Sequence, residues 1–444
     1  KVVDWMVLKT EVAILGGGIG GLTLGLKLAQ ADVHVTVIEK LDGPSPVYKG
    51  ELLQPKSLQI FEQLEILSEI EYNGHKFSRI NFSEIDEEEE ELAMDYQVLP
   101  GEFDYALMIE HETLKGILLK HAMSYSNFEY IKGGLGKGYC EDRLIVEVRK
   151  RKEQFSLKAD FYVGAEGRNS LTRKKIESET KKIDYNHHFL TVTFPRPDSL
   201  TEGQIITAKD KFLGLFPLPD NKVRSVYLIP EGTYKEFQEK GIEHFHQKYI
   251  ELYPELDGYV TKLKSWKDIQ LMIPTAFYAD KYVDGNHVIL GDAAHTVHPM
   301  AGEGMNMAIQ DADVLGELLV TMYETGNLSP KWLSCYEKVR KHRAEKMIKF
   351  SHLSALAYSY PYQLVTGIRQ KGLKQIERDK KLQFKQMLNI SGLGFWQESL
   401  LDRAIQIGML PAREKKLSPA EKESYFYKEK DDYPWKTKLA GGVL

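Results

Sequence analysis

The segment that most constrains the fold is a strand–helix–strand unit at residues 11–40. The apolar run EVAIL leads directly into GGGIGG, an apolar helix follows, and VHVTVIEK forms a second strand that ends in an acid. In such a unit the first glycine makes a tight turn, the second admits a pyrophosphate, and the third lets helix and strand pack closely. Glycines that serve only as turns are the alternative, but the acid about 20 residues later disfavours it. We therefore predict a dinucleotide site at Gly16, Gly18, Ile19, Gly20, Gly21, Glu39 and Lys40, with the Glu39 carboxylate accepting hydrogen bonds from a ribose.

A second constraint lies at residues 288–319. The apolar run Val288–Leu290 predicts a buried strand, and apolar residues recur at helical spacing from Met305 onward. A helix that begins beside glycines offers unpaired N–H groups and partial positive charge to a ligand. An ordinary strand-to-helix connection is the alternative, but several glycines together with an acid favour a site. Its candidate residues are Gly291, Asp292, Gly302, Gly304, Met305 and Asn306.

A third strand end also carries an acid. The strand predicted at Phe155–Val163 runs into Glu166 and Gly167, and Arg173 follows. Ligands collect at the carboxyl ends of parallel strands, which makes Glu166 a candidate ligand-binding residue. A plain strand-to-helix turn is an equal competitor, and the local pattern leaves both interpretations open.

Hydrophobic patterning predicts an α/β fold with a Rossmann-type domain, an inserted, largely antiparallel sheet and C-terminal helices. The predicted parts are residues 7–183, with a small excursion of strands at 77–108, then 184–274, 275–325 and 326–444. Alternating strands joined by a hairpin at Pro219–Asn221 predict the inserted sheet. Helices are expected at Ser57–Ile70, His111–Tyr125, Tyr234–Tyr253, Lys331–Tyr358, Tyr362–Lys385 and Gly394–Ile407, followed by a loosely held end from Lys415.

Charge and cysteine content exclude several classes of protein. A net charge of −5 over 444 residues gives no general basic surface for nucleic acid. Cys140 and Cys335 form neither a disulfide framework nor a metal cluster, which fits a reducing cytoplasm. No apolar window of about 18 residues suits a membrane span, and the start lacks the apolar core of a signal peptide. The acidic run at 86–91 is interpreted as a solvated hairpin tip. The C-terminal helices could lie on a membrane or form a homodimer face, although packing against the body is favoured, and we expect a monomer or a homodimer.

The three motifs, in this order, resemble those of the single-component flavoprotein monooxygenases, the p-hydroxybenzoate hydroxylase-like family. The similarity extends over residues 12–313. It implies that the first motif holds the adenosine half of FAD, that Asp292 binds the ribityl chain, and that amides near Gly304 face the flavin pyrimidine. The segment Ala293–Pro299 is most similar to the ubiquinone-pathway hydroxylases, whereas Gly50–Pro55 resembles squalene monooxygenase, so the substrate stays open.

Two positions depart from the family pattern. Glu166 stands where aspartate is usual, which moves the charge by one methylene and puts the handling of a nicotinamide cofactor in question. His111 stands where many members place an arginine that contacts FAD, and the charge of a histidine depends on pH. Lys49 is a further expected cofactor contact.

The resemblance also implies a chemistry. NADH or NADPH reduces FAD, O2 adds to give a flavin C4a-hydroperoxide, and its distal oxygen hydroxylates an aromatic or other electron-rich small molecule. His298 and Pro299 are candidate catalytic residues, although structural hydrogen bonding in this loop is the favoured role of the histidines. Arg224 and Tyr227, three apart on one predicted strand, should face opposite sides of the sheet, and either could bind substrate.

Three rival functions share this fold. A flavin-dependent halogenase predicts a W-x-W-x-I-P segment, and the five tryptophans stand in no such pattern. A prenyl-lipid reductase would reduce an alkene without consuming oxygen. A non-enzymatic escort protein, similar to the prenyl-GTPase dissociation inhibitors, would bind a protein partner without redox chemistry, and the intact motif at residues 288–319 argues against it.

Overall fold

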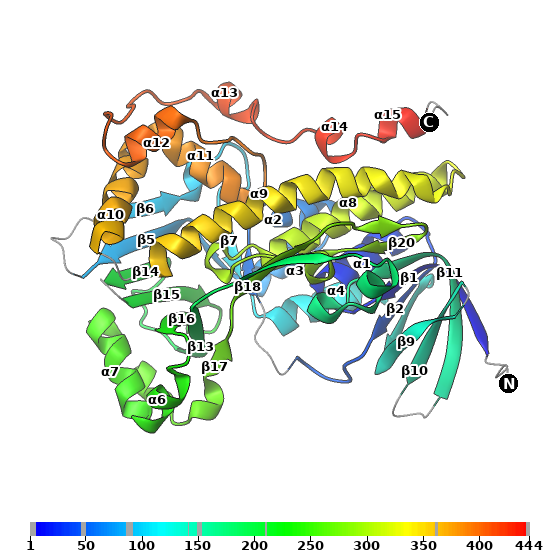
Figure 1. Ribbon diagram of the computed structural model, residues 1–444, viewed down its shortest axis with the longest axis horizontal. Helices are drawn as coiled ribbons and strands as arrows, with labels where there is room; N and C mark the ends of the chain where they lie inside the picture. Colours follow the sequence, from blue (N-terminus) through cyan, green and yellow to red (C-terminus); the bar gives the residue numbers. More distant parts are fainter. Residues whose placement is uncertain are drawn as a thin grey trace.

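The computed structural model of the chain describes residues 6–45, 50–85, 92–140, 142–148, 153–208, 211–359 and 363–440 (Figure 1). Its largest sheet has eight strands, in the order β19-β20-β11-β1-β2-β8, with β10 attached to β11 and β9 attached to β10. The central pairs are parallel, as expected for a strand–helix–strand unit. The strands are β1 (Val7–Leu15), β2 (Val35–Glu39), β8 (Phe128–Lys132), β9 (Gly134–Cys140), β10 (Arg143–Val148), β11 (Glu153–Gly164), β19 (Val283–Asp284) and β20 (His287–Ile289).

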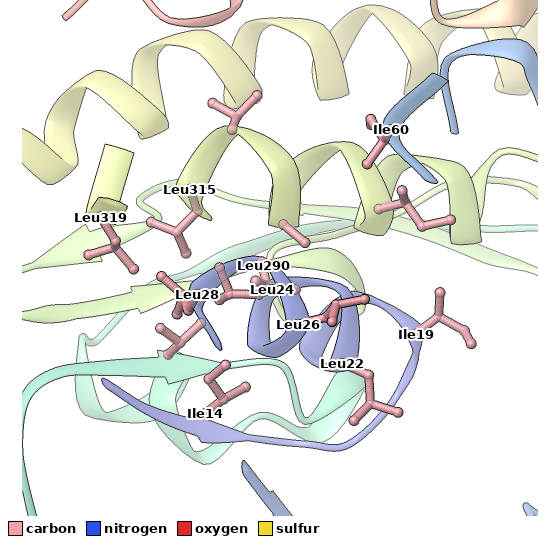
Figure 2. Close-up of a cluster of buried hydrophobic side chains, with 14 of the residues drawn as sticks. Ile14, Ile19, Leu22, Leu24, Leu26, Leu28, Ile60, Leu290, Leu315 and Leu319 are labelled. Atoms are coloured by element: carbon pink, nitrogen blue, oxygen red, sulfur yellow. The ribbon is translucent and has the colours of Figure 1, made fainter. Parts of the chain in front are cut away.

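Helices that share a hydrophobic core cover one face of this sheet. α1 (Ile19–Gln30) packs against α4 (His111–Ala122) and α8 (Gly304–Glu324). Figure 2 shows the leucines of α1 lying among Ile14, Leu290 and Leu315, and all of these side chains are buried. Because each fully buried leucine contributes about 1.5–3 kcal/mol, this cluster fixes the start of α1 and the start of α8 at the same edge of the sheet.

A second sheet of seven strands has the order β17-β13-β16-β15-β14-β5-β6. Every pair in it is antiparallel except β14 with β5, so the prediction of a largely antiparallel sheet is confirmed. Helices α6 (Tyr234–Glu239) and α7 (Ile242–Leu252) cover its outer face (Figure 1). The strands are β5 (Arg79–Glu84), β6 (Leu92–Asp95), β13 (His187–Pro195), β14 (Gly203–Ala208), β15 (Lys211–Leu218), β16 (Lys222–Pro230) and β17 (Gln270–Met272).

Two small sheets lie between the large ones. One has the order β12-β18-β21 and the other β3-β7-β4. Their strands are β3 (Leu52–Leu53), β4 (His75–Phe77), β7 (Ala106–Met108), β12 (Thr180–Asp184), β18 (Thr275–Ala279) and β21 (His295–Thr296). The short helices α2 (Pro55–Gln63), α3 (Leu67–Tyr72) and α5 (Leu171–Lys175) complete this region.

The first of the C-terminal helices runs along α8, and the last short ones pass back along the same side of the molecule (Figure 1). They are α9 (Leu333–Ser359), α10 (Gln363–Arg378), α11 (Lys380–Ser391), α12 (Leu400–Gln406), α13 (Pro419–Glu423), α14 (Glu429–Asp432) and α15 (Lys436–Ala440). Trp435 is fully buried in the main core, and the Asp432 carboxylate pairs with Lys56 at 3.0 Å and with Arg343 at 2.6 Å. The prediction of a loosely held end from Lys415 is therefore wrong for these residues.

Other element boundaries also differ from the sequence prediction. The helix expected at Ser57–Ile70 is split into α2 and α3 where Glu65 takes φ +60°, and the helix expected at Tyr234–Tyr253 is split at Gly241 with φ +88°. The helix expected at Gly394–Ile407 begins only at Leu400. Strands β8 and β9 were not predicted. The acidic run at 86–91 lies outside the described residues. None of the helices in the described ranges is long and apolar enough to cross a bilayer.

Candidate functional site

One large cavity reaches from the edge of the eight-stranded sheet to the inner face of the seven-stranded sheet. Its volume is about 1390 Å³. Single small-molecule pockets span roughly 300–1,000 Å³, so this cavity has room for a dinucleotide and a second molecule. Its wall includes the ends of β1, β2 and β11, the start of α8, and residues of β5, β15 and β16.

The glycine motif stands at one end of this cavity and leaves its backbone open. Gly16 takes φ +109°, and a Cβ there would lie 2.2 Å from the carbonyl oxygen of Ala165. A Cβ on Gly21 would lie 2.0 Å from the carbonyl oxygen of Gly16. Gly18, in contrast, has no heavy atom within 4 Å of that position. The outer glycines are thus required by packing, whereas Gly18 borders open space at the start of α1, which fits a pyrophosphate.

The Glu39 carboxylate holds the loop around the glycine motif. Its oxygens accept hydrogen bonds from the backbone N–H groups of Gly17 and Leu41, at 2.9 and 2.8 Å. Each carboxylate oxygen has two lone pairs, so Glu39 can still accept from a ribose hydroxyl. Glu39, Lys40, Ile19 and Gly20 all line the cavity, whereas Lys49 lies outside the described residues.

The start of α8 forms the next part of the wall. Gly291 and Gly302 take φ +57° and +65°, conformations that favour glycine, and no heavy atom lies within 4 Å of a Cβ on Gly304. The first helical bond runs from Met307 N–H to the Glu303 carbonyl, so the N–H groups before Met307 are available to a ligand. These N–H groups are suited to the electron-rich edge of a bound ring.

Asn306 has a structural role that the sequence did not reveal. Its Oδ1 accepts from Gln54 N–H and Ser57 Oγ, and its Nδ2 donates to the carbonyls of Leu52 and Gly302. The side chain therefore clamps β3 and α2 to the start of α8 and does not line the cavity. Met305 does line it.

A buried acid, Asp311, organises the turn that carries Gly291 and Asp292. Its carboxylate accepts from Gly291 N–H at 2.8 Å, His295 Nε2 at 2.6 Å and Arg340 Nε at 2.6 Å. Burial alone would raise the pKa of Asp311, but His295 and Arg340 more than offset this and hold its pKa well below the usual range. His295 thus has the structural role that the sequence favoured.

Glu166 faces its own turn as well as the cavity. Its oxygens accept from Ser170 Oγ at 2.6 Å and from the N–H and Oγ1 of Thr172 at 3.0 and 2.8 Å. The extra methylene relative to aspartate lets the carboxylate reach the start of α5. Arg173 then ties this motif to the next one, because its Nη1 donates to the Ala293 carbonyl at 2.8 Å. Glu166 remains part of the cavity wall.

Two polar contacts lie in the wall at the cofactor end of the cavity. Arg168 Nε lies 3.9 Å from Asp292 Oδ2, and both side chains are about half exposed. At the start of α4, His111 Nδ1 lies 3.2 Å from the Gly50 carbonyl oxygen. His111, Asp292 and Arg168 all line the cavity.

Arg224 and Tyr227 lie on opposite faces of β16, as predicted. The Arg224 guanidinium lines the cavity and binds the Glu51 carboxylate through two bonds of 2.8 Å. Tyr227 is buried under α7 against Phe237 and Tyr249, outside the cavity wall. Of the two substrate-binding candidates, only Arg224 is therefore positioned to contact a ligand.

The two residues predicted to be catalytic differ in whether they line the cavity. Pro299 lines the cavity, but His298 is fully buried behind it and does not. His298 Nδ1 accepts from Met300 N–H at 3.2 Å, and its Nε2 lies 2.9 Å from His187 Nε2. Burial, together with the neighbouring histidines, lowers the pKa of His298 to about 3, and burial lowers that of His187 to about 4. This geometry favours a structural role for His298 and does not support the predicted catalytic one.

Comparison with known proteins agrees with these features. The FAD binding domain family matches residues 9–351. The chain is 25% identical to 6-methylpretetramide 4-monooxygenase from Streptomyces rimosus over 83% of this chain and 89% of that protein. It is also 25% identical to 3-demethoxyubiquinol 3-hydroxylase from Escherichia coli, over 76% and 85%. The crystal structure of p-nitrophenol 4-monooxygenase from Pseudomonas putida shares the fold, with a TM-score of 0.77, 18% identity and coverage of 87% and 99%.

The residues present fit FAD, because open backbone at Gly18 and Gly304 faces one cavity and the Glu39 carboxylate stands beside it. This chain belongs to the FAD binding domain family and is an FAD-dependent oxidoreductase.

Proposed function

We propose that the protein uses NADH or NADPH and O2 to hydroxylate an aromatic or other electron-rich small molecule. The observation that carries this proposal is the continuity of the cavity. A polar, glycine-lined end suited to FAD opens directly into an apolar end on the inner face of the seven-stranded sheet. A bound flavin and a bound substrate would therefore meet without crossing solvent.

The cofactor end would hold FAD through residues of three motifs. When bound, FAD supplies the redox chemistry by taking a hydride equivalent from the nicotinamide and activating O2. The backbone of the Gly16–Gly21 turn would receive the pyrophosphate, and Glu39 the ribose of the adenosine half. Asp292 would bind the ribityl chain, and the N–H groups from Gly304 to Asn306 would stabilise negative charge on the reduced ring.

The substrate end is largely apolar, and its wall includes the Arg224–Glu51 ion pair. Phe82, Phe212 and Phe216 line it, along with Met94 and Met108. Aromatic and methionine side chains suit a flat or irregular apolar ligand. The Arg224–Glu51 pair adds hydrogen-bonding groups without net charge. We propose that this end takes a neutral or weakly polar ring and excludes water from the reacting atoms.

Three further proposals go with this function. The chain divides into a cofactor domain at residues 7–183 and 275–325, a substrate sheet at 184–274, and C-terminal helices at 326–444. The protein acts in the cytoplasm, which is supported by free thiols at Cys140 and Cys335. It works as a monomer or a homodimer.

The test is the visible spectrum of the purified protein, followed anaerobically while NADH and then NADPH are added. We expect a two-banded oxidised flavin spectrum that bleaches, faster with some members of a panel of phenols. Readmitted O2 should be consumed in proportion to hydroxylated product. Bleaching followed by alkene reduction without O2 uptake would identify a reductase instead. No flavin, even after FAD is added, would contradict the proposal and favour an escort protein.

A further inference from the structure

Helix α12 has a reversed amphipathic pattern, with its acid buried and its leucines exposed. The Asp402 side chain is fully buried, and its carboxylate accepts from Lys385 Nζ at 2.6 Å and from Arg413 Nη2 at 2.7 Å. Leu400 and Leu401, in contrast, face solvent. A surface helix normally buries its apolar residues and exposes its charged ones. The leucines of α12 therefore face a partner outside the described part of the chain.

These leucines belong to a larger apolar surface, called here the α12 patch. Ile407 lies two helical turns after Leu400, on the same face. The chain then folds back on the helix, because the N–H groups of Met409 and Leu410 both donate to the Ala404 carbonyl. Five of the 13 large apolar residues that are exposed in the described chain fall within these 11 positions, so they are not scattered singly, and such a group marks a binding surface. The patch comprises side chains that are 39–89% exposed, namely Leu400, Leu401, Ile407, Met409 and Leu410.

The cavity reaches the surface beside this patch, at the end of the molecule where α10 and α12 lie (Figure 1). Ile407 belongs to the patch and also lines the cavity. Leu353 of α9 is likewise half exposed and lines the cavity, and Arg403 and Gln406 of α12 complete this part of the wall. A side chain that is half exposed and also lines a cavity lies at its mouth. An apolar molecule held at the patch would therefore enter the cavity without crossing water.

The segment around the patch is basic, although the whole chain is acidic. Residues 371–416 contain ten lysines and arginines and five acids, a net charge of +5 in a chain of −5. Three of these acids are turned inward, since Asp379 and Asp402 are fully buried in ion pairs and Glu398 is 11% exposed. The exposed cations therefore dominate the electrostatic potential at this end of the molecule.

Two of these cations border the patch directly. The Cδ of Lys371 lies 3.6 Å from the position of a Cβ on Gly408, which follows Ile407. Arg403 is half exposed on α12, one helical turn from Ile407. Cations beside an anionic bilayer are attracted to its phosphates, and salt weakens this attraction. An apolar face bordered by lysine and arginine is what a helix in a bilayer interface presents.

The same charges disfavour a second copy of the chain as the occupant of the patch. A twofold pairing through this surface would bring two patches, and with them two basic segments, face to face. Like charges repel each other, whereas an anionic lipid surface complements both the apolar residues and the cations. The contact would be peripheral, because none of the helices in the described ranges is suited to cross a bilayer.

We propose that the α12 patch docks on an anionic lipid surface, and that the cavity receives a water-insoluble aromatic substrate from that surface. Leu400, Leu401 and Met409 would enter the boundary of the acyl chains, while Lys371 and Arg403 stay at the level of the phosphates. The substrate part of this inference rests on the proposed function. The docking part does not depend on it.

Sedimentation with lipid vesicles tests the docking. We expect vesicles of equal parts phosphatidylcholine and phosphatidylglycerol to bind the protein about tenfold more tightly than phosphatidylcholine alone, and high salt to remove this preference. Leu400→Ser/Leu401→Ser should weaken binding to both vesicles about tenfold, and Lys371→Glu should weaken only the binding to anionic vesicles. Tyr72→Ser/Met123→Ser is the matched control, because these side chains are 89% and 58% exposed, compared with 89% and 51% for the two leucines. It should bind as the wild type does, and all variants should keep the wild-type Tm because the changed side chains are exposed.

A probe carried by vesicles tests the route into the cavity. Nonylphenol is almost insoluble in water and partitions into bilayers. Supplied in anionic vesicles, it should perturb the flavin absorbance of the wild type, and do so about tenfold more slowly in L400S/L401S, which reaches the vesicles less often. Phenol dissolved in water should perturb both proteins at the same rate.

The docking is overturned if the wild type does not bind vesicles, if L400S/L401S binds them as well as the wild type, or if Y72S/M123S loses as much. A dimer that L400S/L401S converts to monomer, without vesicle binding, would assign the patch to a second copy, and a complex with a soluble protein that needs the patch would assign it to a protein partner. Equal rates with vesicle-borne nonylphenol would overturn the route. Absence of flavin would contradict the proposed function, and vesicle binding by flavin-free protein would still decide the docking.

Discussion

Replacing Asp311 with asparagine should separate the stability of the fold from the order of the cofactor loop. The Asp311 carboxylate compensates the buried Arg340 guanidinium, which is 1% exposed, and anchors the Gly291 turn. Removal of one partner from a buried ion pair costs about 3–5 kcal/mol, because the other charge stays buried and uncompensated. A typical domain has only about 5–15 kcal/mol of stability, so D311N should unfold at clearly lower urea concentration.

The same substitution should weaken FAD binding. Each hydrogen bond to a charged group contributes about 1.5–3 kcal/mol, and D311N disturbs the bonds to Gly291 N–H and His295 that shape the turn carrying Asp292. We expect the Kd for FAD to rise at least tenfold, since 1.4 kcal/mol corresponds to a factor of ten. The assays are urea unfolding of flavin-free protein and titration of FAD fluorescence under native conditions.

Two controls make this prediction refutable. Asp313→Asn removes a buried acid two residues along the same helix, where Lys27 still has Glu317 as a second partner at 2.9 Å. D313N should lose less stability and keep its FAD affinity. The double variant D311L/R340M replaces the pair with apolar groups, so it should regain stability without regaining FAD affinity. Equal FAD affinities in D311N and D313N would refute the role of Asp311 in ordering the loop.

Two other predictions concern the glycine motif and the histidine pair. Gly18→Ala places a methyl in open space, so Tm should barely change while FAD affinity falls at least tenfold. Gly21→Ala should lose about 1–3 kcal/mol of stability, because its methyl would meet the Gly16 carbonyl. Thermal unfolding and FAD titration check both variants, and similar stability losses in the two would contradict the assignment. The pKa values of His298 and His187, about 3 and 4, lie below the unfolded value of about 6.5, so the protein should lose about 1.6 kcal/mol of stability per histidine as the pH falls from 6.5 to 5. His298→Gln should flatten the pH profile of stability measured by urea unfolding.

Short-range patterns were sufficient for much of the fold. The glycine turn, its flanking strands and the hairpin at Pro219–Asn221 are set by local chemistry, and the structure reproduces them. Strand β9 escaped prediction because GLGKGYC contains three glycines, which weaken any strand pattern. Its pairing with β10 supplies the stability that its own sequence lacks.

The parts of the candidate site that depend on local backbone conformation could be predicted from the sequence. The parts held by side chains far apart in the chain could not. The glycines and Glu39 follow from spacing alone. Asp311 does have a signal in the sequence, because it is an acid on the apolar stripe of α8 between Ala308 and Leu315. Its partner Arg340 lies 29 residues further on, and no local pattern connects the two.

The return of the C-terminal segment has a consequence for how the protein is made. The Lys56–Asp432 bond joins positions 376 residues apart, and Trp435 enters the core formed by α1 and α8. At about 5–20 residues per second, a ribosome needs roughly 20–75 s to travel between these two positions. The apolar seat of Trp435 is complete only when α8 ends at Glu324, and it then stays uncovered while the 111 residues up to Trp435 are made, so chaperones that shield apolar surface during synthesis should raise the yield of folded protein.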